Sequence, residues 1–164
     1  MSIVSPFYDA PTAGGFLSNS ENKELQFPAG TGFWLILQED AVISNSIPAI
    51  QATNGLEIPL YRGWNLIGNP FTRPVYLSSI KLRYQGEIRT LQQDQDKNYT
   101  RNPWVQGPAG QSSQFFGYSS SQHSPGYVPV PWIGGKLEPF QGYWIRALKG
   151  GSLPQDRLYI ILQL

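Results

Sequence analysis

The apolar positions of this chain recur with a period of two wherever a period can be read. Residues 56–60 and 64–66 alternate between apolar and polar side chains, and residues 61–63 can form a bend between them. Alternation places every second side chain on one face of an extended chain. We therefore predict two half-buried strands on either side of this bend.

A second alternating segment predicts a hairpin with one solvent-exposed face. Within residues 75–84, Ile80 and Leu82 share one face, and charged side chains alternate with them. Residues 88–91 can pair with this strand across a turn at residues 85–87. The pattern is typical of a strand pair at the surface of a β-domain.

Four other segments predict strands by different signals. Residues 33–38 form a continuous apolar run, which is typical of a central strand with both faces covered. Residues 127–133 alternate, but their two prolines have no amide hydrogen for a ladder, so we predict an edge strand or a polyproline segment. Residues 142–148 and 158–164 supply two closing strands.

Composition sets the fold class. Gly 17 and Pro 14 interrupt every window long enough for a helix of more than about two turns. We therefore predict an all-β fold, an antiparallel β-sandwich or barrel-like domain formed by residues 1–164. Residues 92–126 are a long polar loop region, and because such a connection is uncommon inside a compact domain, we expect it to be functional or to contain short strands.

Charge and cysteine content narrow the functional classes. The chain has 12 Lys and Arg residues and 11 Asp and Glu residues, so it has almost no net charge. Its overall charge therefore does not attract nucleic acid or an anionic membrane. The chain has no cysteine, which excludes disulfides, thiolate zinc sites and a cysteine nucleophile. No apolar run approaches the ~20 residues that span a bilayer, and residues 1–16 lack the features of a signal peptide. The abundant uncharged polar side chains favour a domain of a longer exported chain, extracellular or at the cell surface.

One short element occurs twice in the chain. Residues 32–34 are Gly-Phe-Trp and residues 142–144 are Gly-Tyr-Trp, and each copy follows a leucine and a proline. Between the copies, residues 63–71 have the sequence Gly-Trp-Asn-Leu-Ile-Gly-Asn-Pro-Phe, which is dense in residues with restricted backbone roles. The two elements together predict an internal repeat.

These motifs resemble β-rich repeats of large bacterial exported and cell-surface proteins. In those repeats a strand with Leu, Pro and Gly-Tyr-Trp alternates with a Gly-Trp-Asn-Leu-Ile-Gly-Asn-Pro strand. The resemblance implies half a repeat unit at residues 25–43 and a full unit at residues 56–164, with residues 92–126 as a loop insertion. Such modules serve as spacers, adhesive domains and appendages of secreted enzymes alike, so the resemblance implies no particular ligand.

Catalytic chemistry has little support in the sequence. His123 is the sole histidine, and it lies among serines in a polar tract, where a solvated loop histidine is the simpler interpretation. No spacing among the acidic residues marks a pair for glycoside cleavage. We therefore predict that the chain is not an enzyme and needs no cofactor, and we keep a glycan-active hydrolase as the third alternative.

A calcium loop is the one metal site that the sequence suggests. Asp94, Asp96 and Asn98 place oxygen donors at alternate positions, as such a loop does. The position that needs glycine is Tyr99, and the position that needs a closing carboxylate is Val105. We prefer a solvated turn and keep calcium at these three residues as the weaker alternative.

The five tryptophans fall into two groups. Trp34, Trp64 and Trp144 lie in apolar strands, so we expect them in the core. Trp104 and Trp132 lie among Pro, Gly, Ser and Gln, where we expect partly exposed rings. Flat rings flanked by amide and carboxylate groups suit a sugar-binding surface, although loop aromatics also close the ends of β-sandwiches.

The function predicted from these residues is a non-catalytic module of a larger exported protein that binds carbohydrate or a cell surface. The ligand-binding residues would be Trp104, Trp132, Tyr99, Tyr118 and Tyr127. Its partners would be a glycan or cell-surface component and the other domains of the parent chain. The alternative is a structural, spacer or assembly repeat with no small-molecule ligand, and exposure of the two loop tryptophans separates the two hypotheses.

Overall fold

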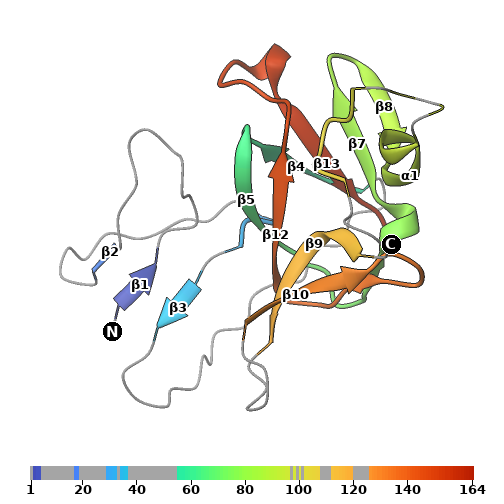
Figure 1. Cartoon of the computed structure of the whole chain (residues 1–164). Coiled ribbons are helices and arrows are strands. Elements are labelled where there is room, and N and C mark those ends of the chain that lie inside the picture. Colours follow the sequence, from blue (N-terminus) through green and yellow to red (C-terminus); the bar gives the residue numbers. More distant parts are fainter. Residues whose placement is uncertain are drawn as a thin grey trace.

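The computed structural model describes residues 2–4, 17–18, 29–32, 34–36, 55–96, 98, 100, 102–107, 112–119 and 126–164. Two four-stranded antiparallel sheets dominate this part of the chain (Figure 1). The first sheet has the order β10-β9-β12-β5, formed by Gly126–Pro131, Ser112–Ser119, Gly142–Ala147 and Gly63–Gly68. The second has the order β4-β13-β7-β8, formed by Leu56–Leu60, Leu158–Leu162, Lys81–Tyr84 and Glu87–Thr90.

The hydrophobic core lies between these two sheets. Ile67 and Phe115 from the first sheet are buried in the same cluster as Leu82 and Ile160 from the second. Burying one face of each of two sheets against the other is the arrangement of a β-sandwich. The predicted fold class, all-β with antiparallel sheets in a sandwich-like domain, is confirmed.

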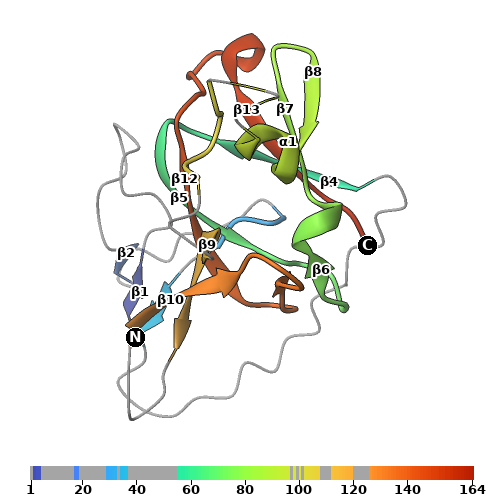
Figure 2. The same cartoon turned by 45° about the vertical axis from the view of Figure 1, so that its right-hand side comes forward.

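Shorter elements close the ends of the sandwich. They are strands β6 (Val75–Tyr76) and β11 (Lys136–Leu137), which pair with each other, the 3₁₀ turns η2 (Leu77–Ser79) and η3 (Pro154–Asp156), and helix α1 (Leu91–Gln95). Helix α1 begins at a capping box in which Thr90 and Gln93 satisfy each other's backbone amides, and it lies beside the β7–β8 hairpin (Figure 2). No helix in the described part of the chain is long and apolar enough to cross a membrane.

Several predicted elements are confirmed. Strands β7 and β8 form the predicted hairpin, and its turn residues Gln85 and Gly86 both have positive φ. Strand β10 is an edge strand, as its prolines require. The two segments at residues 56–60 and 64–66 are strands, but they join different sheets and do not pair with each other.

One prediction about a strand needs correction. The apolar run at residues 33–38 contains β3 (Trp34–Ile36), which is an edge strand of a small sheet β2-β1-β3 with β1 (Ser2–Val4) and β2 (Leu17–Ser18). Hydrophobicity alone therefore did not make it a central strand. The polar region at residues 92–126, which was predicted to be functional or to contain short strands, contains β9, and this strand pairs with β10 and β12.

The motif at residues 63–71 is a structural element whose asparagines satisfy buried backbone groups. The Asn65 side chain accepts from the backbone N–H of Tyr61 and donates to the carbonyls of Tyr61 and Gly63, so it holds the bend before β5. The Asn69 side chain donates to the carbonyls of Arg73 and Leu137 and accepts from the backbone N–H of Phe71. Both side chains are buried, so each hydrogen bond replaces water that cannot reach these groups.

The two copies of the repeated element both lie beside β5. In β12, Tyr143 pairs with Ile67, and on the opposite edge of β5, Thr31 forms an antiparallel bridge with the same residue. The Gly32 amide donates to the carbonyl of Leu66, and a Cβ at Gly32 would lie only 2.7 Å from the Leu66 side chain. This close approach requires glycine, whereas the symmetry of the repeat remains a prediction.

Candidate functional site

The outer face of the first sheet carries an aromatic surface. Side chains alternate across a strand, and this places Trp64, Phe116 and Trp144 on the face opposite the core. Tyr118 and Tyr127, which pair directly across β9 and β10, join them on this face. We call these five residues the aromatic face.

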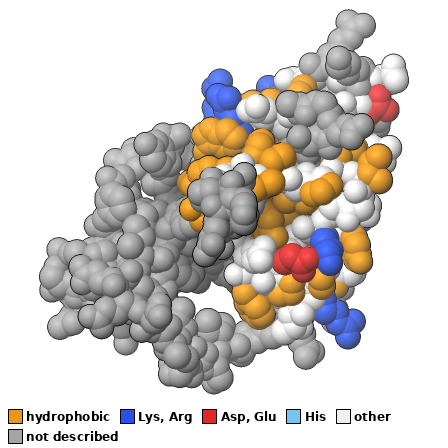
Figure 3. Space-filling view, turned by 60° about the horizontal axis from the view of Figure 1, so that its bottom comes forward, with side chains coloured by type: hydrophobic (Ala, Val, Ile, Leu, Met, Phe, Trp, Pro, Cys, Tyr) orange, Lys and Arg blue, Asp and Glu red, His pale blue; other side chains and the backbone are white. Residues whose placement is uncertain are grey.

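The rings of the aromatic face form a cleft of about 330 Å³ lined by Trp64, Phe116, Tyr127 and Trp144. Trp64 is 40% exposed, Tyr118 51% and Tyr127 56%, while the other two rings are half-buried. On the face shown in Figure 3, hydrophobic side chains gather in broad areas between a few charged ones. Surfaces of this kind on soluble domains usually mark an interaction site.

The rings touch one another edge to face. The centroids of Trp64 and Phe116 are 5.9 Å apart at an interplanar angle of 72°, and those of Tyr127 and Trp144 are 6.5 Å apart at 79°. Tyr118 meets Tyr127 at 73°. These rings therefore form a corrugated, self-supporting surface and no flat platform.

Trp64 and Trp144 were predicted to lie in the core, and for Trp64 this is wrong. Both strands that carry them are apolar on both faces, so alternation could not show which face is covered. One signal was present: Arg146 shares a face with Trp144, and a charged side chain at that position marks the outer face. The Trp34 side chain lies outside the described residues.

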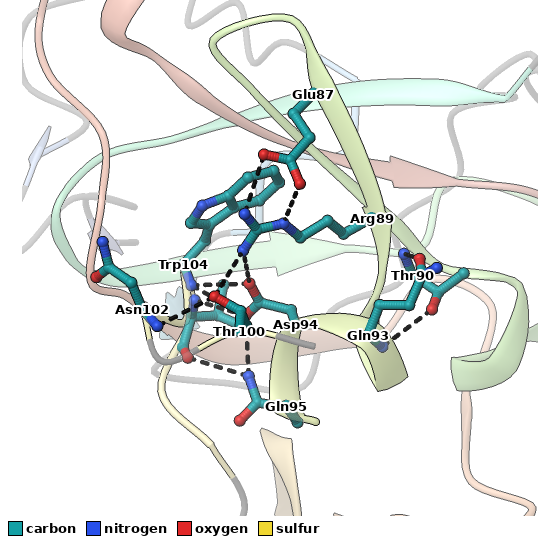
Figure 4. A network of polar contacts seen from close by, with 10 residues as sticks. Glu87, Arg89, Thr90, Gln93, Asp94, Gln95, Thr100, Asn102 and Trp104 are labelled. Atoms are coloured by element: carbon teal, nitrogen blue, oxygen red, sulfur yellow. Dashed lines mark hydrogen bonds and ion pairs between the residues drawn. The ribbon is translucent and has the colours of Figure 1, made fainter. Parts of the chain in front are cut away.

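Trp104 was predicted to be an exposed stacking ring, and it is instead 4% exposed. The guanidinium of Arg89 lies over the Trp104 ring (Figure 4), with Cζ 3.9 Å from the ring centroid. The Tyr84 ring meets the Trp104 ring edge-on. The backbone carbonyl of Trp104 accepts from the amide of Leu148, and the next residue forms a bridge with Ala147 of β12. Trp104 therefore anchors its loop to the sandwich and cannot present a ring to a ligand.

Asp94 explains why this polar loop turns inward. Its buried carboxylate accepts from the backbone amides of Trp104 and Val105, and its Oδ1 lies 3.5 Å from Nη1 of Arg89. Figure 4 shows Asp94 between Arg89 and the backbone of Trp104. Burial raises the pKa of the Asp94 carboxyl above its ordinary value, against the lowering effect of these two amides and of Arg89. Asp94 is thus a structural residue that ties a loop to helix α1.

The calcium alternative finds no support in this geometry. The carboxylate of Asp94 faces backbone amides, and Asp96 accepts from the amide of Asn98 in a local turn. The described residues contain no group of three or more His, Cys, Asp or Glu side chains able to hold a metal ion. Tyr99 and His123 lie outside the described residues.

The predicted ligand residues are divided between two places. Tyr118 and Tyr127 belong to the aromatic face, whereas Trp132 lies at one end of the sandwich, half-buried and packed against the core. There it lines a separate cleft of about 460 Å³ between η2, the start of α1 and the loop after β10. The structure therefore does not bring the five predicted residues into one site.

Comparisons of the chain with known protein families, with curated proteins and with solved structures find no match.

Proposed function

We propose that this chain is a non-catalytic assembly module that associates with a second copy of itself through the aromatic face. The observation that carries the proposal is a surface of five exposed or half-buried rings, contributed by all four strands of one sheet. Water leaves such a surface favourably when it meets another apolar surface. The proposal takes only the assembly role from the structural alternative of the sequence analysis and gives it a defined contact surface.

The chemistry of the aromatic face favours an apolar protein surface over a sugar. No charged or amide side chain is among the described residues that line its cleft. Sugar hydroxyls buried there would lose hydrogen bonds to water without replacement, which costs about 1–3 kcal/mol for each unsatisfied group. In addition, rings that meet at 72–79° leave no coplanar platform on which a pyranose chain could lie.

A second copy is the occupant that the chain itself supports. The formal net charge is +1, so copies of the chain do not repel each other strongly. The cleft of the aromatic face is lined by aromatic rings, and an identical face offers the same apolar chemistry. A two-fold dimer, in which the same patch serves on both subunits, is the commonest soluble assembly.

Sedimentation equilibrium of the full chain over the micromolar range tests this proposal. The parent chain should show a monomer–dimer equilibrium, and the double variant Trp64→Ser/Tyr127→Ser should be monomeric. Tyr76→Ser is the matched control, because Tyr76 is an equally exposed aromatic residue on β6, outside the first sheet, and its loss should leave the dimer intact. A parent chain that stays monomeric throughout, or a dimer that survives the double substitution, would reject the proposal.

A further inference from the structure

We propose that the cleft beside Trp132 is a binding site for a neutral sugar unit. This cleft is separate from the aromatic face, because the described residues that line it include none of those that line the cleft on that face. Its volume of about 460 Å³ falls in the range of about 300–1,000 Å³ typical of small-molecule sites. Sugar binding at this cleft and assembly through the aromatic face can therefore be tested separately.

The floor and walls of this cleft are preformed. Leu77 and Leu91 are buried at its base, and the amide of Leu77 donates to the carbonyl of Gly135, which ties η2 to the loop after β10. At Gly134 φ is +70°, and a Cβ at Gly135 would lie 1.9 Å from the carbonyl oxygen of Pro131. Glycine therefore suits both positions, and the hydrogen bond between Leu77 and Gly135 joins the backbone beside Trp132 to η2.

The side chains that line the cleft match a sugar. Trp132 supplies one half-buried ring whose exposed part can stack on the C–H face of a pyranose. Ser78 and Gln92 are exposed at the same cleft, and their side chains make no hydrogen bond within the described part of the chain, so the hydroxyl and amide groups can bind ligand hydroxyls. Thr90 accepts from the amide of Gln93 at the start of α1 and keeps its own O–H available to donate.

Other ligand classes fit the cleft less well. No Lys, Arg, Asp or Glu is among the described residues that line it, which removes the usual partners of phosphates, carboxylates and metal ions. A purely apolar ligand would leave the hydroxyl and amide groups of Ser78, Thr90 and Gln92 without water or partner. One ring combined with several neutral donors and acceptors is the combination that a polyhydroxylated, uncharged ligand satisfies.

Titration of the full chain with four soluble probes tests the inference. The probes are linear oligosaccharides of β-linked glucose, α-linked glucose, xylose and N-acetylglucosamine, and binding is followed by saturation-transfer NMR and by isothermal calorimetry. At least one probe should bind, with a dissociation constant that changes little with salt because no charge lines the cleft. Failure of all four probes to bind at millimolar concentration would overturn the proposal.

Variants identify the cleft as the site. Ser78→Ala and Gln92→Ala remove exposed groups without a folding role, and each should weaken binding about two- to tenfold, as the loss of one neutral hydrogen bond does. Trp132→Ala should abolish binding, and a folded state of that variant is verified by circular dichroism. Gln155→Ala, an exposed glutamine in η3, and Trp64→Ala on the aromatic face are the controls and should bind like the parent. Binding that is insensitive to Ser78→Ala and Gln92→Ala, or lost with Trp64→Ala, would place the site elsewhere and contradict the inference.

Discussion

Trp64 and Phe116 meet edge to face with centroids 5.9 Å apart, although strand β12 lies between the strands that carry them. Tyr127 reaches Trp144 across β9 in the same way. Ring contacts that cross an intervening strand hold the aromatic face in a fixed shape without burying it. A surface that is both rigid and apolar loses little conformational entropy when it binds, which is why we assign the intermolecular contact to this face.

The positions of Trp104 and Trp64 predict losses of stability of different size. Trp104→Ala should lower the free energy of unfolding by about 3–5 kcal/mol, because it removes a large buried ring and the support of Arg89. Trp64→Ala removes a ring that is 40% exposed and should cost clearly less. Urea denaturation followed by far-ultraviolet circular dichroism measures both values. Equal losses for the two variants would show that the assignment of buried and exposed rings is wrong.

Asp94 and Asp96 form a matched pair for testing the loop. Asp94→Ala leaves the amides of Trp104 and Val105 without their acceptor and should cost about 3 kcal/mol of stability. Asp96→Ala removes an exposed local contact with Asn98 and should cost less than about 1 kcal/mol.

The same pair distinguishes a structural role from calcium binding. Because the contacts of Asp94 are to backbone amides, the melting temperature of the parent chain should be the same in calcium chloride and in EDTA. A rise in melting temperature with calcium that disappears in Asp94→Ala and Asp96→Ala would instead establish the metal site.

The motif asparagine Asn69 should be far more important than a surface asparagine. Asn69→Ala leaves the carbonyls of Arg73 and Leu137 and the amide of Phe71 without their partners, and we expect a loss of about 2–4 kcal/mol. Asn102→Ala, at an exposed position whose side chain has no such role, is the control and should change stability by less than about 0.5 kcal/mol. Chemical denaturation of the two variants decides whether the motif is a structural element.

Tyr143 predicts an alkaline loss of stability. Burial raises the pKa of its phenol above the ordinary value of 10.0, while the Glu138 amide that donates to its oxygen acts in the opposite direction. At a pH between the ordinary pKa of the unfolded chain and the raised pKa of the folded chain, the phenol has lost its proton in the unfolded state but keeps it in the folded state. The free energy of unfolding therefore falls as the pH rises above 10. The slope for one group is at most about 1.4 kcal/mol per pH unit.

The variant Tyr143→Phe isolates this effect. Its free energy of unfolding should be lower than that of the parent at neutral pH, because the contacts with Glu138 and Gln141 are lost, and the difference should shrink above pH 10. A difference that stays constant from pH 8 to pH 11 would show that the Tyr143 phenol titrates alike in both states.

Much of the strand pattern follows from the sequence because alternation reports which faces are covered. The hairpin at residues 81–90, the proline-rich edge strand β10 and the closing strands β12 and β13 could all be predicted in this way. Alternation fails where both faces of a strand are apolar. In β12, Tyr143 and Trp144 are both large aromatics, and only Arg146, two residues further on, indicates which of them faces outward.

The polar region at residues 92–126 could not be predicted because its structure depends on distant contacts. The carboxylate of Asp94 accepts hydrogen bonds from two backbone amides ten and eleven residues further along the chain, and these hydrogen bonds hold Trp104 in the core. No local sequence signal shows that pairing. The candidate site was therefore only partly predicted: Tyr118 and Tyr127 lie on the aromatic face, but the tryptophans beside them are not the ones that the sequence indicated.

Fluorine NMR of the chain labelled with 5-fluorotryptophan tests the central claim most directly, because it observes the tryptophans separately during association. Resonances are assigned by single Trp→Phe substitutions and followed over a dilution series. The account predicts that the Trp64 and Trp144 signals shift with protein concentration while the buried Trp104 signal stays constant, as does that of Trp132 in its separate cleft. Signals of Trp64 and Trp144 that are independent of concentration, or a shift confined to Trp132, would contradict assembly through the aromatic face.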